Sequence, residues 1–269
     1  MNLELKDQVA VVVGGASGIG LAIATSLAKE GAKVAILDRS PQGASEASRL
    51  AAEHGVMTTG IEVDATQFST VKQAIAEVAS QLGAIEHVVY AAGMGSGKFG
   101  FPFWNLDPAD WPRVFEVNLM GAVNTAHACA PLLAEQKRGT MLFISSVAGQ
   151  IGSPTDPPYS TAKAALISFA QIAAKDFAPL GVRVNTICPG MVQTPLNRSV
   201  WQSWNDLQPD DKKRSYEDWA GEKVKNVIPL KRWQTPDDVA SLAVFLASAR
   251  AANITGQTMN VDGGWVMHW

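Results

Sequence analysis

Tyr159 and Lys163 stand four positions apart and are the pair of residues best suited to proton transfer. On a helix that spacing places both side chains on one face, so the ammonium can lie near the phenol. A free phenol has a pKa of about 10, and bringing it to neutrality requires about 4 kcal/mol of preferential phenolate stabilisation, part of which Lys163 can supply. Tyr159 is therefore the candidate for the base that takes a hydroxyl proton while the adjoining C–H bond gives up a hydride.

A glycine-rich segment follows the first apolar run of the chain. Gly14, Gly18 and Gly20, with Ser17 and Ile19 among them, precede a good helix-forming stretch. Glycines at these positions let the backbone approach a pyrophosphate at a helix N-terminus, where free N–H groups and the helix macrodipole favour an anion. The apolar run before it and the helix after it make this a predicted dinucleotide site.

Two charged residues, Asp38 and Arg39, stand where a second predicted strand ends. The carboxylate is placed to accept hydrogen bonds from an adenosine ribose and to repel a 2′-phosphate. Arg39 could pair with such a phosphate, but the glycine-rich turn carries no lysine or arginine. The sequence therefore predicts NAD as the cofactor, with NADP less favoured.

Strand-like and helix-like stretches alternate from one end of the chain to the other, which is typical of a parallel sheet. The strand candidates are residues 9–14, 33–38, 58–64, 87–92, 140–146, 183–189 and 257–262. The helix candidates are residues 19–30, 42–53, 67–82, 109–136, 159–178 and 236–249. Right-handed crossovers would place helices on both faces, so we expect an α/β, doubly wound, Rossmann-like fold with a seven-stranded parallel sheet, in one domain over residues 1–269.

Composition excludes several classes of protein. A chain of 269 residues that is 47% hydrophobic and 17% charged can bury a core without disulfides or metals, and a net charge of -3 argues against nucleic acid as a partner. The longest stretch without charged side chains, residues 117–134, contains asparagines, a histidine and Pro131, so no membrane span is expected. Scattered histidines and two cysteines form no metal motif and favour a cytoplasmic protein.

In order and spacing, the motifs resemble those of the short-chain dehydrogenase/reductase family, classical subgroup. The residues that carry the resemblance are Gly14-x-x-x-Gly18-Ile19-Gly20, Asp64, Ala91-Ala92-Gly93, Asn118, Ser146, Tyr159-x-x-x-Lys163 and Pro189-Gly190. They span nearly the whole chain, and the set is far more specific than Tyr-x-x-x-Lys alone. The resemblance implies nicotinamide-dependent interconversion of an alcohol and a carbonyl compound.

The resemblance also implies roles for single residues. Ser146, with its neighbour Ser145 as the rival, would hydrogen-bond the substrate oxygen, and Asn118 would mark a local helix break whose backbone carbonyl holds a proton-relay water. Tyr159 and Lys163 would also contact the nicotinamide ribose. Further cofactor contacts are expected at the strand ends and in the loop over the nicotinamide, from Asp64, Ala65, Ala92, Gly93, Pro189, Gly190, Val192 and Thr194.

Two departures from the family pattern stand near the cofactor. Val13 occupies a position where the family usually has threonine, and Tyr90-Ala91 replaces a familiar Asn-Asn. Side-chain hydrogen bonds inside the fold are lost with them. We expect the departures to affect turn rigidity more than the type of reaction.

Two long segments, residues 94–108 and 191–233, interrupt the alternation. The second leaves the sheet beside the expected nicotinamide site and is rich in tryptophan, so we expect residues 191–233 to form a lid over the substrate. The aromatic side chains of both segments have three alternative roles: stacking on a sugar or polyol, which is slightly favoured, lining an apolar pocket, or packing in the core or a subunit interface. They are Trp201, Trp204, Phe99, Phe101, Phe103 and Trp104. The candidate substrate contacts are Gly95, Gln150, Met191 and Trp201.

Asp156, three positions before Tyr159, bears on the substrate class. A fixed negative charge there disfavours an anionic substrate, so the sequence favours oxidation of a neutral secondary alcohol, a sugar or polyol. A reductase of 3-oxoacyl compounds, diketones or cyclic ketones is the alternative within the family. A sensor or scaffold that binds NAD without turnover is the alternative outside it, and the intact Ser146, Tyr159 and Lys163 count against that.

The resemblance implies a homotetramer or homodimer, in which helices 109–136 and 159–178 pair across an interface. The ending of the chain, residues 263–269, is unusually aromatic for a free terminus. We expect it to dock on a neighbouring subunit and reach that subunit's active site.

Overall fold

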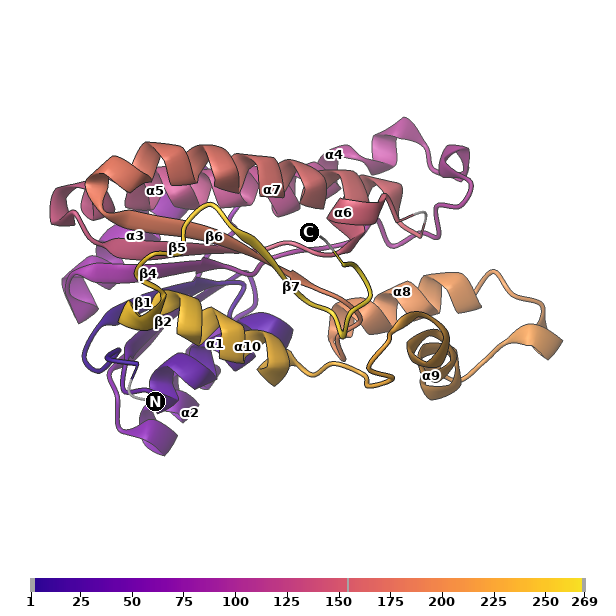
Figure 1. Cartoon of the computed structure of the whole chain (residues 1–269), viewed down its shortest axis with the longest axis horizontal. Helices are drawn as coiled ribbons and strands as arrows, with labels where there is room; N and C mark the ends of the chain where they lie inside the picture. The colour runs from indigo at the N-terminus through magenta and orange to yellow at the C-terminus, as the bar shows by residue number, and fades with distance from the viewer. Residues whose placement is uncertain (1–2, 154, 268–269) are drawn as a thin grey trace.

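The centre of the computed structural model, which describes residues 3–153 and 155–267, is a parallel sheet with the strand order β3-β2-β1-β4-β5-β6-β7 (Figure 1). All neighbouring strands pair in parallel. The strands are β1 (Val9–Val13), β2 (Lys33–Asp38), β3 (Thr58–Glu62), β4 (Ile85–Tyr90), β5 (Gly139–Ile144), β6 (Val182–Pro189) and β7 (Thr258–Val261). The order reverses between β1 and β4, which places a ligand crevice at their carboxyl ends.

Helices cover both faces of the sheet (Figure 1). One face carries α1 (Gly18–Lys29), α2 (Gln42–His54) and α10 (Pro236–Ala247), and the other carries α3 (Phe68–Leu82), α5 (Gly121–Gln136) and α7 (Pro157–Phe177). The central strands are apolar along their whole length, as β1 with its sequence VAVVV shows, because both of their faces are buried. The predicted doubly wound fold is thus confirmed.

The longest predicted helix, residues 109–136, is broken into several pieces. A short 3₁₀ turn η2 (Pro108–Asp110) leads into α4 (Pro112–Phe115), and a π-helical turn η3 (Glu116–Met120) separates α4 from α5. Asn118 lies in the π turn, so the helix break expected there is present. Single π turns often accompany functional sites, since they redirect backbone groups.

The lid segment, residues 191–233, contains two helices that the sequence does not clearly show. They are α8 (Pro195–Asn205) and α9 (Tyr216–Val227), joined through the 3₁₀ turn η5 (Asp210–Lys212), and both project beyond the sheet (Figure 1). Side-chain caps from Thr194 and Ser215 begin these helices. Their apolar faces pack on each other in a third, separate core cluster, centred on Trp219, Ala220 and Ile228.

The smaller elements complete the chain. They are η1 (Phe103–Asn105), α6 (Ala148–Ile151), η4 (Ala178–Leu180) and η6 (Ala249–Ala251). Within the described ranges, no helix is both long and apolar enough to cross a membrane.

Candidate active site

A cavity of about 830 Å³ runs along the carboxyl edge of the sheet and ends under the lid segment. Most of the residues expected to bind a cofactor or substrate line it. They are Gly14, Ser17, Gly18, Ile19, Gly20, Asp38, Arg39, Asp64, Ala65, Ala92, Gly93, Gly95, Ser146, Tyr159, Lys163, Pro189, Gly190, Met191, Val192 and Thr194.

The glycine-rich turn at one end of the cavity fits a pyrophosphate. Gly14 has a φ of +79°, and a Cβ there would collide with the backbone of Ala91 and Ala92. Ser17 is the N-cap of α1, yet its side chain makes no capping hydrogen bond. The first amides of α1 therefore have no side-chain partner and can serve an anion.

Asp38 anchors this turn to the end of β2. Its carboxylate accepts hydrogen bonds from Ala16 N at 3.0 Å and from Ser40 N at 2.9 Å. Arg39 lines the same part of the cavity. Both a ribose acceptor and a cation able to meet a 2′-phosphate are therefore present at this end.

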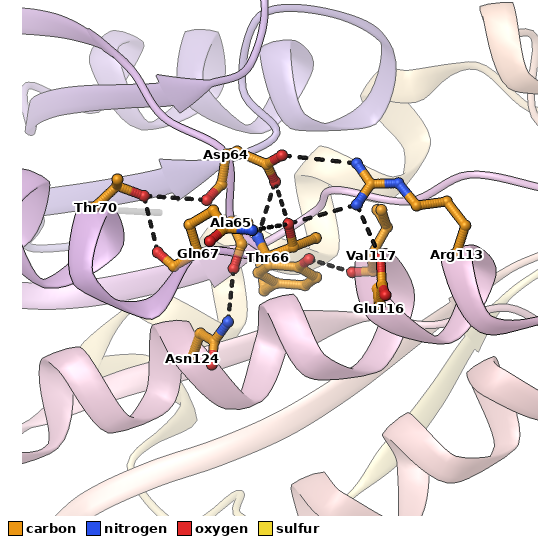
Figure 2. Close-up of polar contacts among 10 residues, drawn as sticks. Asp64, Ala65, Thr66, Gln67, Thr70, Arg113, Glu116, Val117 and Asn124 are labelled. Atoms are coloured by element: carbon orange, nitrogen blue, oxygen red, sulfur yellow. Dashed lines mark hydrogen bonds and ion pairs between the residues drawn. The ribbon is translucent and has the colours of Figure 1, made fainter.

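Asp64, after β3, is held in place by a small polar network (Figure 2). Its carboxylate accepts hydrogen bonds from Thr66 N at 2.9 Å and Thr66 Oγ1 at 2.8 Å, and it lies 3.6 Å from the guanidinium of Arg113. Burial opposes ionisation of Asp64, but the hydrogen bonds and the charge of Arg113 outweigh it and lower the pKa. The carboxylate is thus ionised beside the cavity.

Tyr90, at the end of β4, ties the sheet to the π turn. The side chain is fully buried, and its hydroxyl donates to the carbonyl oxygen of Val117, next to Asn118. A Cβ at Gly121 would collide with that hydroxyl, so the contact depends on a glycine at the start of α5. The departure from the family's asparagine therefore introduces a hydrogen bond of its own, which holds the π turn against the sheet.

Lys163 and Tyr159 face the cavity from one side of α7, as their spacing predicts. Lys163 is buried, donates from Nζ to the carbonyl oxygen of Ile144 at 2.8 Å, and lies 5.6 Å from the centroid of the Tyr159 ring. The Ser146 hydroxyl lies close enough to the Tyr159 side chain to lower the pKa of the phenol. A phenol, a hydroxyl and an ammonium are thus gathered where β5 ends.

Gly93 and Asn118 complete this group. Asn118 is buried and donates from Nδ2 to the carbonyl oxygens of Met94 at 2.7 Å and Val114 at 2.9 Å, whereas its Oδ1 has no partner among the described residues. A Cβ at Gly93 would lie 3.0 Å from Oδ1 of Asn118 and 3.3 Å from Nζ of Lys163. The bare glycine therefore keeps the space between the amide and the ammonium open.

Burial shifts the pKa values of Tyr159 and Lys163 in opposite directions, and each shift favours the neutral form of the group. Desolvation raises the pKa of Tyr159, an effect that the nearby Ser146 hydroxyl opposes. Desolvation lowers the pKa of Lys163 to about 8. Since a protonated Lys163 favours the phenolate, each group supports the charged form of the other.

The two adjacent serines, Ser145 and Ser146, make different contacts. The Ser145 hydroxyl is buried and donates to the carbonyl oxygen of Lys163 at 2.8 Å, which secures β5 to α7. Ser146 instead lines the cavity beside Tyr159, and its Oγ accepts a hydrogen bond from Ala148 N at 3.1 Å. The geometry favours Ser146 as the partner of a substrate oxygen.

Two of the four predicted substrate residues lie away from the cavity. Gln150 exchanges hydrogen bonds with Asn260 at 2.8 and 3.0 Å, which joins α6 to β7. Trp201 packs on the Tyr216 ring and donates from Nε1 to the carbonyl oxygen of Arg214 at 3.1 Å, so it belongs to the lid's own core. Their side chains follow the register of α6 and α8, which the sequence alone does not set.

The aromatic side chains of the long segments also lie elsewhere than expected. Phe101, Phe103 and Trp104 are exposed and do not line the cavity, and Trp204 packs on Trp219 inside the lid. Stacking of these residues on a sugar is therefore not supported.

Several residues that do line the cavity are absent from the predicted set. Trp219 and Lys223 share a face of α9, and Trp265 reaches the cavity from the ending of the chain. Trp265 packs on the lid cluster of its own subunit. Docking of the chain's ending on a neighbouring subunit stays a prediction, and residues 268 and 269 lie outside the described part of the chain.

Asp156 lines the cavity, as its position suggests, but its charge is partly used. It caps α7 by accepting from Tyr159 N at 3.4 Å, and its other oxygen accepts from Ser96 N at 2.8 Å. Burial raises its pKa despite these bonds. The repulsion of an anionic substrate is therefore weaker than the sequence suggests.

Comparison with known proteins gives the family. A protein-family model described as enoyl-(acyl carrier protein) reductase matches residues 14–266 of the chain. The chain is 33% identical over 265 residues to 2-(S)-hydroxypropyl-CoM dehydrogenase 3 of Xanthobacter autotrophicus, which covers 98% of each chain. It is 33% identical over 266 residues to galactitol 2-dehydrogenase of Agrobacterium fabrum, which covers 97% of this chain and 98% of the relative.

A solved structure agrees over the whole length. The L-sorbose reductase of Gluconobacter frateurii, complexed with NADPH and L-sorbose, superposes with a TM-score of 0.90 and 29% identity, and covers 100% of both chains. The fold, the gathered side chains and these matches define the class: a nicotinamide-dependent oxidoreductase acting on an alcohol or ketone group. The chain belongs to the short-chain dehydrogenase/reductase family.

Proposed function

We propose that the protein is an NAD-dependent dehydrogenase that oxidises a secondary alcohol of a sugar or polyol to the ketone. The observation that carries the proposal is the meeting of Ser146, Tyr159 and Lys163 in the cavity that the glycine-rich turn opens at its other end. Galactitol 2-dehydrogenase and L-sorbose reductase, both similar to this chain, are named for a polyol and a sugar.

The residues present would hold the dinucleotide along the carboxyl edge of the sheet. The free amides of α1 would hold its pyrophosphate, and Asp38 its adenosine ribose. NAD is our choice because the Asp38 carboxylate is anchored by two backbone amides and would meet a 2′-phosphate with its negative charge. When bound, the nicotinamide would supply the acceptor for the hydride of the carbinol carbon.

The chain's own groups then move the proton. Ser146 would hydrogen-bond the substrate oxygen, and Tyr159, as the phenolate, would take its proton. Lys163 stabilises the phenolate by its charge, and the carbonyl of Ile144 fixes the position of the ammonium. The π turn at Asn118, held by Tyr90, would provide a proton path from Lys163 toward solvent through a bound water.

The subunit is proposed to work as a homodimer or homotetramer in the cytoplasm. Ile172 on α7 is 56% exposed, and an apolar side chain on that face suits pairing of α7 with its copy. Cys129 and Cys188 are both buried and free, which suits a reducing compartment.

The test compares the wild type with Tyr159→Phe in initial rates with NAD and NADP, against polyols, sugars, hydroxy acids and hydroxyacyl thioesters. We expect turnover with NAD and a polyol, faster at higher pH because the phenolate is the base. In the variant, turnover should fall about 10³-fold with NADH binding retained.

Other outcomes would redirect the proposal. Turnover of hydroxyacyl thioesters alone would favour a 3-oxoacyl reductase. The matching family model, which is described as an acyl carrier protein reductase, agrees with that alternative. Binding of NADH with no turnover of any compound would favour a sensor.

A further inference from the structure

The lid wall of the cavity carries a lysine that the proposed chemistry leaves unused. Lys223 lies on α9, is half-buried, and lines the cavity together with Val200, Trp219 and Val227. Its ammonium lies 4.0 Å from the centroid of the Trp219 ring, which is itself fixed in the lid core. The ring face thus holds a cation at the substrate end of the cavity.

Among the described residues, no carboxylate lies within ion-pair distance of Lys223. Neighbouring basic residues of the lid segment pair with acids on its outer surface: Arg198 with Glu217, Lys213 with Asp210, and Arg214 with Glu222. Burial lowers the pKa of Lys223 to about 8, so it is still mostly protonated at neutral pH. A half-buried charge without a counterion is costly, and an anion entering the cavity would relieve that cost.

The acidic groups of the cavity do not fill this role. Asp156 is held by the amides of Ser96 and Tyr159, and Asp38 and Asp64 belong to the glycine-rich end. The other buried cation, Lys163, already donates to Ile144. The cavity therefore has one amino group at the lid end that is available for a ligand.

We propose that Lys223 binds an anionic group, a carboxylate or a sulfonate, at the end of the substrate remote from the reacting carbinol. The inference rests on the proposed function and refines its substrate class to sugars or polyols that carry a terminal acid group. Val200 and the buried Trp219 ring line the cavity beside Lys223, and these apolar neighbours strengthen an ion pair there.

The test uses gluconate and sorbitol, which differ in a terminal carboxylate, and 5-hydroxyhexane-1-sulfonate as the sulfonate arm, since its anionic group is remote from the carbinol. We expect the wild type to prefer an acid, and Lys223→Met to lower kcat/KM for that acid about tenfold or more while sorbitol changes less than twofold. Lys223→Arg should retain the preference. Lys225→Met removes the same charge from the exposed side of the same helix and should change neither substrate.

A binding measurement separates this inference from the proposed function. Quenching of tryptophan fluorescence in the enzyme–NADH complex by gluconate or the sulfonate should be lost in Lys223→Met and kept in Lys225→Met. Lys223-dependent binding without turnover would support the anion site and count against the dehydrogenase. If Lys223→Met leaves both the anion binding and the acid preference as in the wild type, the inference is wrong.

Discussion

The two ends of the cavity differ in the groups that line them: backbone at one end and side chains at the other. At the glycine-rich end the backbone forms the surface: Gly14 and the free amides of α1 face the cavity, while Asp38 and Asp64 accept from amides of their own loops. At the lid end side chains form the surface, above all Trp219, Lys223 and Trp265. One end is suited to a ligand that many related proteins share, and the other can be changed by single side chains.

The support beneath the two ends also differs. The glycine-rich end rests on strands buried on both faces between two helix layers. The lid end rests on a small cluster of its own, around Trp219 and Ile228, which lies apart from the sheet cores. Substitutions at the glycine-rich end should therefore weaken cofactor binding. Substitutions at the lid end should destabilise the lid segment alone.

The largest effect is expected at Gly14. In Gly14→Ala the new Cβ would collide with the backbone of Ala91 and Ala92, so NADH binding should weaken more than about 100-fold, measured by fluorescence titration. Gly55→Ala is the matched control, since Gly55 also has a positive φ, +67°, with nothing within 4 Å of its Cβ position. It should cost about 1 kcal/mol of stability and leave binding intact. Near-normal binding by Gly14→Ala would show that the turn tolerates a side chain.

A second effect, intermediate in size, is expected in the lid. Trp219→Ala removes a buried ring from the lid cluster and should cost about 3 kcal/mol there. Hydrogen exchange should speed up across α8 and α9 but not in the strands, and kcat/KM should fall with NADH binding retained. Trp104→Ala, at an exposed tryptophan, should show neither change. Loss of protection in the strands as well would mean that the lid and the sheet unfold together.

The smallest effect is expected at Asp38, where a side chain discriminates at the glycine-rich end. Asp38→Asn keeps the size and removes the charge that would face a 2′-phosphate, while Arg39 stays in place. The ratio of kcat/KM with NADP to that with NAD should rise about tenfold, or about 1.4 kcal/mol. An unchanged ratio would assign the choice of cofactor to Arg39 or to the loop backbone.

More of the glycine-rich end than of the lid end can be predicted from the sequence, and the reason is physical. Strands buried on both faces read as continuous apolar runs, and glycines that need a positive φ or a close approach leave a mark at fixed spacing. Asn118, a poor helix former, marked the π turn in the same way.

The lid gave no such signal. Whether Trp201 or Trp219 faces the cavity depends on how α8 and α9 pack on each other. Because both residues are tryptophans, their type does not distinguish them. Gln150, predicted to contact the substrate, is instead hydrogen-bonded to Asn260. That partner is far away in the sequence, so nothing near Gln150 indicates the contact. Lys223 could have been noticed four positions after Trp219, but only with the packing face of α9 already known.

The two ends of the lid segment meet again at its base. Val192 and Gln234 form an isolated parallel bridge, and Gln193 N donates to the carbonyl oxygen of Gln234 at 3.0 Å. The intervening stretch therefore departs after β6 and returns to nearly the same point before α10, with its own hydrophobic cluster in between. Such a stretch is suited to replacement by another sequence, in evolution or by grafting, as long as the bridge between Val192 and Gln234 at its base is kept.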